Sequence, residues 1–186
     1  MFAEAWSPDG RALLVRDSHS MGGRVDLLML TPGEPPILAP YIADGFAHRQ
    51  ASFSPDGRWV AYVTNETGQL QVVVRSFPDP SLAKVPVSAN GGAHPRWRAD
   101  GRELFYADAL SKVIAVPFAP GTSPAVGAPV ELFAFPTTVT LTGGQGLGAP
   151  FDVFPDGQQF IAVTPRQFES GVSLAVTVNW NSGLRP

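Results

Sequence analysis

Short apolar runs, bounded by Gly, Pro, Asn and Asp, recur along the whole chain. Trp59–Val63, Leu104–Tyr106 and Phe160–Val163 are examples, and they are rich in the β-branched and aromatic residues that favour strands. Their apolar residues stand at consecutive positions instead of alternating with polar ones. A strand of this kind has both faces covered, so the pattern predicts β-sheets that stack face to face.

One motif, found four times, organises these runs: an apolar residue is followed three positions later by Asp-Gly. Its copies are Trp6-Ser7-Pro8-Asp9-Gly10, Phe53-Ser54-Pro55-Asp56-Gly57, Trp97-Arg98-Ala99-Asp100-Gly101 and Val153-Phe154-Pro155-Asp156-Gly157. The four aspartates lie 47, 44 and 56 residues apart. This period is close to the roughly 40–50 residues of a four-stranded propeller blade. The repeat therefore predicts one blade for each motif.

Each motif has the chemistry of a tight turn between two strands. Pro fixes φ near −65°, Asp can accept hydrogen bonds from backbone amides, and Gly tolerates a positive φ. We therefore assign a structural role in the turn to Asp9, Gly10, Asp56, Gly57, Asp100, Gly101, Asp156 and Gly157, and we do not expect the aspartates to bind metal. Ser7 and Ser54, which precede Pro, are expected to form hydrogen bonds within the same turns.

Further strands complete each predicted blade. Third strands are expected near 25–30, 70–74, 112–116 and 172–178, and shorter fourth strands with flanking prolines near 36–38, 84–87 and 129–133. Prolines suit an outer edge, where one side of the strand needs no ladder hydrogen bonds. The predicted fold class is an all-β propeller of four-stranded antiparallel blades, three complete and one incomplete. The blades span about 1–42, 43–90, 91–136 and 149–186, and residues 137–148 form a loop.

The composition agrees with this fold and excludes several classes of function. With 19 Gly and 19 Pro in 186 residues, long helices are disfavoured, and 44% hydrophobic residues indicate a packed core. The net charge is −3 and neither sign forms a run, so we expect no nucleic-acid binding. The absence of cysteine excludes disulfides and thiolate chemistry. No apolar stretch approaches the roughly 20 residues of a membrane span, and the first residues lack the pattern of a signal peptide.

No catalytic, cofactor or metal site is predicted. The glycine-rich segment Gly143–Gly148 has no following Lys-Ser or Lys-Thr and is interpreted as a loop between blades. His19, His48 and His94 lie in different repeats without metal-ligand spacing. No Gly-x-Ser-x-Gly turn is present to activate a serine.

A candidate binding surface lies at the start of the first strand of each blade. We call the apolar residue that begins each motif its anchor. The residues three positions before the anchors come from different blades and are expected to meet at one end of a channel; they are Gln50, His94 and Pro150. His48, Arg49 and Arg96 add polar and positively charged groups to this rim. Because Arg can bind a carboxylate through two hydrogen bonds, the rim could receive a carboxylate or a peptide. The alternative is that these are ordinary solvated loop residues.

Two further expectations concern packing. The aromatic residues Trp6, Phe53, Trp59, Trp97, Phe105 and Tyr106 are expected in the cores between blades. The last strand, Val172–Val178, is apolar, lacks Pro and has no following strand. An unpaired edge recruits other strands, so we expect it to pair with further sequence or to drive self-association.

With these turns and strands, the chain resembles the TolB-like β-propeller family, whose repeats are described as WD-like. The segments 53–66 and 91–106, and the ending at 176–180, are similar to propellers attached to bacterial serine/threonine kinases. No kinase motif is present in this chain. The resemblance implies a sensor module of a larger signalling protein, with a protein or peptide as partner and no catalysis. The sequence does not determine the compartment, and an extracytoplasmic location is one option.

Two alternatives remain open at this point. One is a propeller belonging to a hydrolase, either gating a peptidase domain as in prolyl oligopeptidases or acting as a lactonase. The other is a structural spacer without a ligand. Fold alone does not distinguish these functions, because related propellers serve many of them.

Overall fold

The computed structural model describes residues 1–18, 23–121, 123–134, 151–162 and 175–177. Every regular element within these ranges is a β-strand. These ranges contain no helix with the length and apolar character needed to cross a membrane. The strands form antiparallel sheets in sequence order, as the repeat predicts.

The first two blades are four-stranded sheets whose strands follow one another from edge to edge. The first blade consists of β1 (Phe2–Trp6), β2 (Leu13–Ser18), β3 (Val25–Thr31) and β4 (Ile37–Ile42). The second blade consists of β5 (His48–Phe53), β6 (Trp59–Thr64), β7 (Gln71–Ser76) and β8 (Lys84–Pro86). All the neighbouring pairs are antiparallel.

The third blade differs from the prediction at its outer edge. After β9 (Ala93–Trp97), β10 (Glu103–Ala107) and β11 (Lys112–Ala119), two short strands pair with β11 instead of one: β12 (Ala125–Val126) and β13 (Val130–Ala134). The interruption lies beside Pro117, which has no N–H for the ladder. There the N–H of Gly127, which lies between β12 and β13, donates to the carbonyl of Pro117 in β11 at 2.8 Å.

The fourth blade contains β14 (Phe151–Val153), β15 (Phe160–Ala162) and β16 (Ala175–Thr177). The strand β16 belongs to the predicted last strand, and the remainder of that strand lies outside the described residues, as do the loop at 137–148 and Pro150. The prediction of an all-β chain built from four-stranded antiparallel blades is confirmed, with a last sheet of three described strands.

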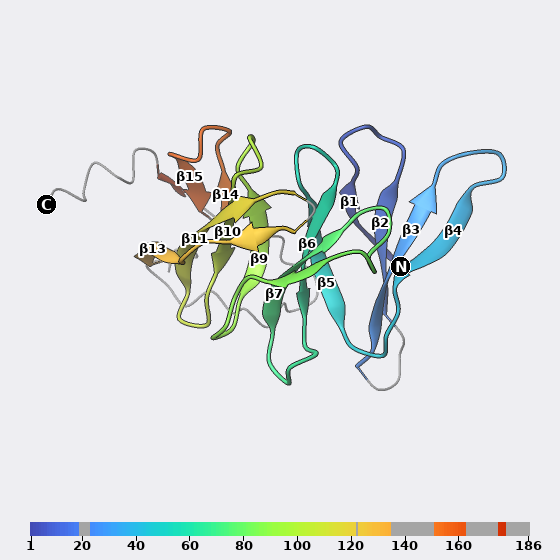
Figure 1. The fold of residues 1–186 in the computed structure, drawn as a ribbon, viewed down its shortest axis with the longest axis horizontal. Helices are drawn as coiled ribbons and strands as arrows, with labels where there is room; N and C mark the ends of the chain where they lie inside the picture. The colour runs from blue at the N-terminus through green and yellow to red at the C-terminus, as the bar shows by residue number, and fades with distance from the viewer. Residues whose placement is uncertain (19–22, 122, 135–150, 163–174, 178–186) are drawn as a thin grey trace, which may run out of the picture.

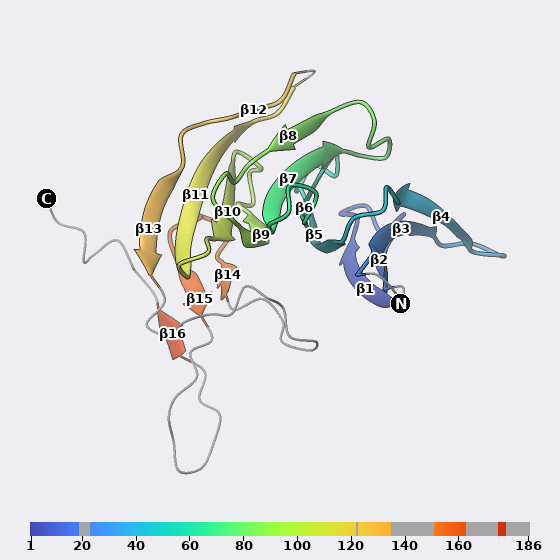
Figure 2. The ribbon, with the colours of Figure 1, turned by 90° about the horizontal axis from the view of Figure 1, so that it is seen from below.

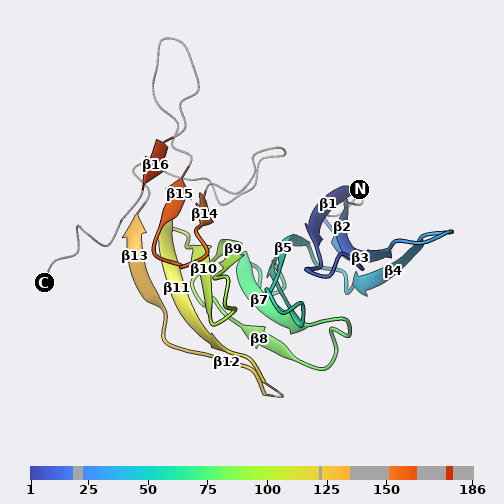
Figure 3. The same ribbon diagram turned by 90° about the horizontal axis from the view of Figure 1, so that it is seen from above.

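The blades stand side by side (Figure 1), and the perpendicular views in Figures 2 and 3 show that they are fanned along an arc. The first strands of the blades lie next to one another in the order β1, β5, β9 and β14. Figures 2 and 3 show β8 and β12 on the opposite, convex side of the arc. The first strand of each blade is therefore the inner strand.

The four Asp-Gly turns have one geometry. Gly10, Gly57, Gly101 and Gly157 have φ values of 71°, 69°, 70° and 72°. In each turn an oxygen of the aspartate accepts a hydrogen bond from the backbone N–H two residues later, at 2.9 to 3.1 Å. Ser7 and Ser54 also behave as predicted: each hydroxyl donates to the turn aspartate and accepts a backbone N–H.

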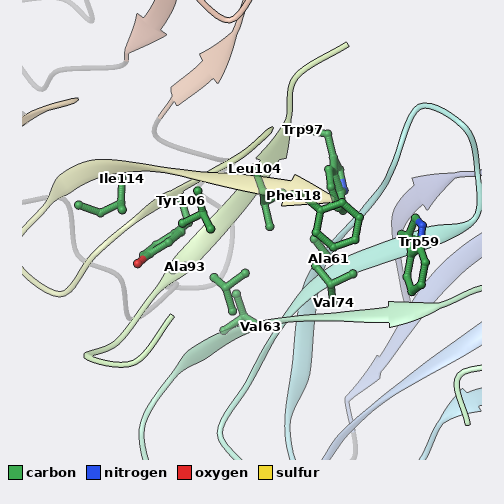
Figure 4. Close-up of a cluster of buried hydrophobic side chains, with 12 residues drawn as sticks. Trp59, Ala61, Val63, Val74, Ala93, Trp97, Leu104, Tyr106, Ile114 and Phe118 are labelled. Carbon is green, nitrogen blue, oxygen red and sulfur yellow. The ribbon is translucent and has the colours of Figure 1, made fainter. Parts of the chain in front are cut away.

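Apolar cores fill the spaces between consecutive blades. The core between the second and third blades is drawn in Figure 4, and its members include Trp59, Ala61, Val63, Val74, Ala93, Trp97, Leu104, Tyr106, Ile114 and Phe118. Leu14, Leu27 and Tyr41 of the first blade meet Phe53, Val60 and Tyr62 of the second. Phe105 and Val113 of the third blade meet Phe151 and Phe160 of the fourth. The predicted core positions of Phe53, Trp59, Trp97, Phe105 and Tyr106 are confirmed.

The prediction for Trp6 is wrong, because this side chain is 55% exposed. The equivalent anchors Phe53 and Trp97 pack against the blade that precedes their own. The first blade has no such neighbour among the described residues, so the same motif position faces outward there.

Candidate functional site

Polar side chains follow the inner strands of the arc from the first blade to the fourth. We call this set the inner row; its members are Glu4, Arg16, Arg49, Gln50, His94, Arg96 and Asp152. All except Arg16 lie on the strands β1, β5, β9 and β14, and Arg16 lies on β2 beside β1. Of the six residues that the sequence predicts for a binding surface, the inner row contains Arg49, Gln50, His94 and Arg96, and Pro150 lies outside the described residues.

Two members of the inner row have an unusual backbone. Gln50 and His94 both have a φ of 56°, in the left-handed region that few residues other than glycine adopt. Each lies at an irregularity in the pairing of its inner strand with the next strand of the blade. Bulges of this kind redirect side chains. Here the Oε1 of Gln50 accepts the backbone N–H of His94 at 2.8 Å, which links the second blade to the third.

Glu4 makes the corresponding link between the first and second blades. Its Oε2 accepts the backbone N–H of Ala51 at 3.2 Å, and its Oε1 lies 3.0 Å from Nε of Arg16. The approach to Arg16 is an ion pair without the alignment of a hydrogen bond. Burial raises the pKa of the Glu4 carboxyl, and Arg16 opposes that shift.

Arg49 is the least compensated charge of the inner row. No hydrogen bond or ion pair joins it to another residue in the part of the chain that the structure describes, and its Nε is buried. Burial lowers the pKa of the guanidinium, the positive charge of Arg16 adds to this shift, and Glu4 opposes it. An arginine remains charged at neutral pH even so, and an anion nearby would stabilise it.

His94 and Arg96 occupy the part of the inner row nearest the fourth blade. His94 is only 5% exposed, and burial followed by the charge of Arg96 lowers its pKa to about 4. The imidazole is therefore neutral at pH 7. Arg96 has a partner, because its Nε lies 3.4 Å from Oδ1 of Asp152 on β14. Burial lowers the pKa of Arg96, and Asp152 opposes this shift.

His48 lies apart from the inner row, although it is close to Arg49 and Gln50 in sequence. It is fully buried, its Nε2 is 2.6 Å from Oδ1 of Asp44, and its ring packs edge-on against Tyr62. Partial burial raises the pKa of Asp44, but the interactions with His48, the backbone N–H of Phe46 and the charge of Arg75 together outweigh burial, and the net shift is downward. His48 is thus held in the core and is not available to a partner in this structure.

The sequence search missed Glu4, Arg16 and Asp152. The predicted surface combined the residues three positions before each anchor with the polar neighbours of Gln50 and His94. It did not include Glu4 and Asp152, which stand two positions and one position before their own anchors. Applying both positions to every blade predicts the two carboxylates. Arg16 follows its Asp-Gly turn on the second strand, and nothing in the motif points to it. Within the described ranges, no group of three or more His, Asp or Glu side chains could hold a metal ion.

No family of known proteins matches the chain by sequence, and no curated protein matches it. Solved structures do match. TolB from Acinetobacter baumannii has a TM-score of 0.59 and 16% identity, with 87% of this chain and 37% of that chain covered. The periplasmic gluconolactonase PpgL from Pseudomonas aeruginosa has a TM-score of 0.56 and 16% identity, with 89% and 50% covered. An auxiliary nutrient binding protein from Bacteroides thetaiotaomicron has a TM-score of 0.52 and 13% identity, with 82% and 34% covered.

At these identities the likeness concerns the fold. It agrees with the four fanned sheets, and the chain has the fold of a partial TolB-like β-propeller. The chain spans half or less of the length of each of these three structures. The named activities of those proteins belong to them, and a propeller fold carries many functions.

Proposed function

We propose that this chain is a non-catalytic recognition module that binds a protein or peptide along the inner row. The observation that carries this proposal is Arg49, a half-buried guanidinium that has no hydrogen bond or ion pair within the described residues. A buried charge without a partner lowers stability. Such a group is retained at this cost where a ligand supplies the missing partner.

The links between the blades support the same proposal. Glu4 accepts the N–H of Ala51, and Gln50 accepts the N–H of His94, so inner strands of consecutive blades are joined through side chains. These bonds fix the polar groups of the inner row before any partner arrives. A site of this kind loses little conformational freedom on binding.

Lactone hydrolysis is the main alternative. We prefer recognition because the pKa and the burial of His94 do not suit a general base. A general base works best when its pKa lies near the working pH. The pKa of about 4 and the 5% exposure of His94 make it a weak and poorly accessible base at neutral pH.

A spacer without ligand is the other alternative, but it would have no use for the charge of Arg49. We further propose that the module is part of a larger signalling protein, because segments 53–66 and 91–106 resemble propellers attached to bacterial kinases.

Selection of peptides from a displayed random library on the purified chain tests the proposal. We expect selected peptides to bind the native chain and to bind Arg96→Gln at least several-fold more weakly, with the melting temperature measured for both. Arg58→Gln is the matched control, because Arg58 is an exposed arginine paired with Asp56 in an Asp-Gly turn away from the inner row. Binding that is lost equally in both variants, or in neither, would contradict the proposal. Turnover of gluconolactone by the native chain would favour the alternative.

A further inference from the structure

The inner row has a surplus of positive charge between the first and second blades. Arg16 and Arg49 lie near one carboxylate, Glu4. The charges of both arginines oppose the rise in the pKa of Glu4 that burial causes, and the charge of Arg16 lowers the pKa of Arg49. Both carboxylate oxygens of Glu4 already have partners, because one faces Arg16 and the other accepts the N–H of Ala51. The group therefore carries one positive charge more than its own carboxylate balances.

The other arginines that the structure describes do not share this situation. Arg24, Arg58, Arg75, Arg96 and Arg98 each lie within 4.0 Å of an Asp carboxylate. Arg102 has no such partner among the described residues but is exposed, so water can solvate it. Arg49 combines a buried Nε with the absence of a partner in the described residues. An anion would therefore be stabilised more strongly beside Arg49 than beside the other described arginines.

We propose that Arg49 and Arg16 together bind a single carboxylate of a peptide ligand, from an Asp or Glu side chain or from a chain end. This inference rests on the proposed function and names its ligand chemistry. One carboxylate neutralises the net charge of +1 on Arg16, Arg49 and Glu4. A phosphate dianion would instead leave a net negative charge beside the buried Glu4. The planar guanidinium suits a carboxylate because two N–H groups can donate to its two oxygens.

Arg16 is held in position for this role. Its guanidinium lies over the ring of Phe2, with Cζ 4.9 Å from the ring centroid, and its Nε faces Glu4 at 3.0 Å. A cation held by an aromatic face and a carboxylate has restricted rotamers. Glu4 thus orients Arg16, and the ligand carboxylate would be shared between Arg16 and Arg49.

The experiment titrates the ¹⁵N-labelled native chain with acetyl-Gly-Gly-Glu-Gly-Gly-amide and follows the Nε–Hε resonance of Arg49 by NMR. We expect a saturable shift that the matched Gln peptide does not produce. In Arg49→Gln, shifts of the neighbouring Ala51 amide should require roughly tenfold or more peptide, since a hydrogen bond to a charged group contributes about 1.5–3 kcal/mol. Arg49→Lys should bind with intermediate strength, and Arg58→Gln should bind as the native chain does.

Several results would overturn this assignment. Equal shifts with the Glu and Gln peptides would exclude recognition of the carboxylate. Equal movement of the exposed Arg58 resonance would mean nonspecific attraction, and a folded Arg49→Gln variant with unchanged affinity would place the anion elsewhere. This outcome can be distinguished from failure of the proposed function. If selected peptides bind Arg96→Gln more weakly but bind Arg49→Gln as they bind the native chain, the recognition module is supported and only the carboxylate site is contradicted.

Discussion

The backbone N–H of His94 donates to Oε1 of Gln50 at 2.8 Å, and the two residues occupy equivalent positions of consecutive blades with the same φ of 56°. The side chain of one repeat thus completes the bulge of the next. The bond holds His94 almost fully buried beside Arg96, and this environment lowers the pKa of its imidazole. A structural link between blades therefore has a measurable electrostatic consequence.

The first prediction is a loss of stability in mild acid that depends on His94. Its pKa falls from an ordinary 6.5 to about 4 in the folded chain, so the unfolded state binds more protons between these values. The free energy of unfolding should therefore decrease as the pH falls from about 6.5 to about 4, by as much as about 3 kcal/mol from this group. Urea unfolding at a series of pH values measures the decrease.

His94→Asn supplies the comparison for that experiment. Asn tolerates the left-handed backbone and does not titrate in this range. The stability of the variant should vary less with pH over the same window, and the difference between the two curves isolates His94 from carboxylates such as Glu4. Parallel curves for the two proteins would show that His94 keeps an ordinary pKa.

The second prediction compares two tryptophans at the same motif position. Trp97 is 8% exposed, packs edge-on against Phe118 at 5.0 Å and donates from Nε1 to the carbonyl of Ser52. Trp97→Ala should therefore lower the free energy of unfolding by about 3–5 kcal/mol. Trp6→Ala should cost less than about 1 kcal/mol, because Trp6 is 55% exposed. Chemical denaturation measures both values, and equal costs would mean that Trp6 is covered in solution.

These tryptophans also show what the sequence can and cannot predict. The Asp-Gly turns were predictable because their geometry depends on residues within the turn, and all four have the expected positive φ at Gly. The exposure of Trp6 depends on whether another blade precedes its own, which the motif does not encode. The burial of His48 likewise depends on Asp44 and Tyr62, which come from other elements. Four of the six candidate rim residues lie in the inner row, because the blades repeat and equivalent positions of consecutive blades therefore lie next to one another.

The third prediction concerns the serine of the second turn. Ser54 is 1% exposed, donates to Oδ1 of Asp56 at 2.6 Å and accepts the N–H of Trp59 at 3.0 Å. Ser54→Ala leaves that buried N–H without its side-chain partner and should cost about 1–3 kcal/mol. Ser81→Ala is the matched control, because Ser81 makes the same bond to Asp79 in an exposed loop. Ser81→Ala should lower the free energy of unfolding by less than about 0.5 kcal/mol. Urea unfolding measures both variants, and equal losses of stability would refute the role of burial at Ser54.

The last prediction separates the two arginines of the proposed carboxylate site by stability. Arg49 has no partner within the described residues, so Arg49→Met removes a desolvated charge and should leave the melting temperature unchanged or raise it. Arg16→Met removes the partner of Glu4, whose side chain is only 11% exposed, and should cost about 1–3 kcal/mol at neutral pH. Calorimetry of both variants in buffer without peptide measures these opposite signs. A strong destabilisation by Arg49→Met would show that Arg49 is already paired in the free protein, and its proposed role in binding would then lose its basis.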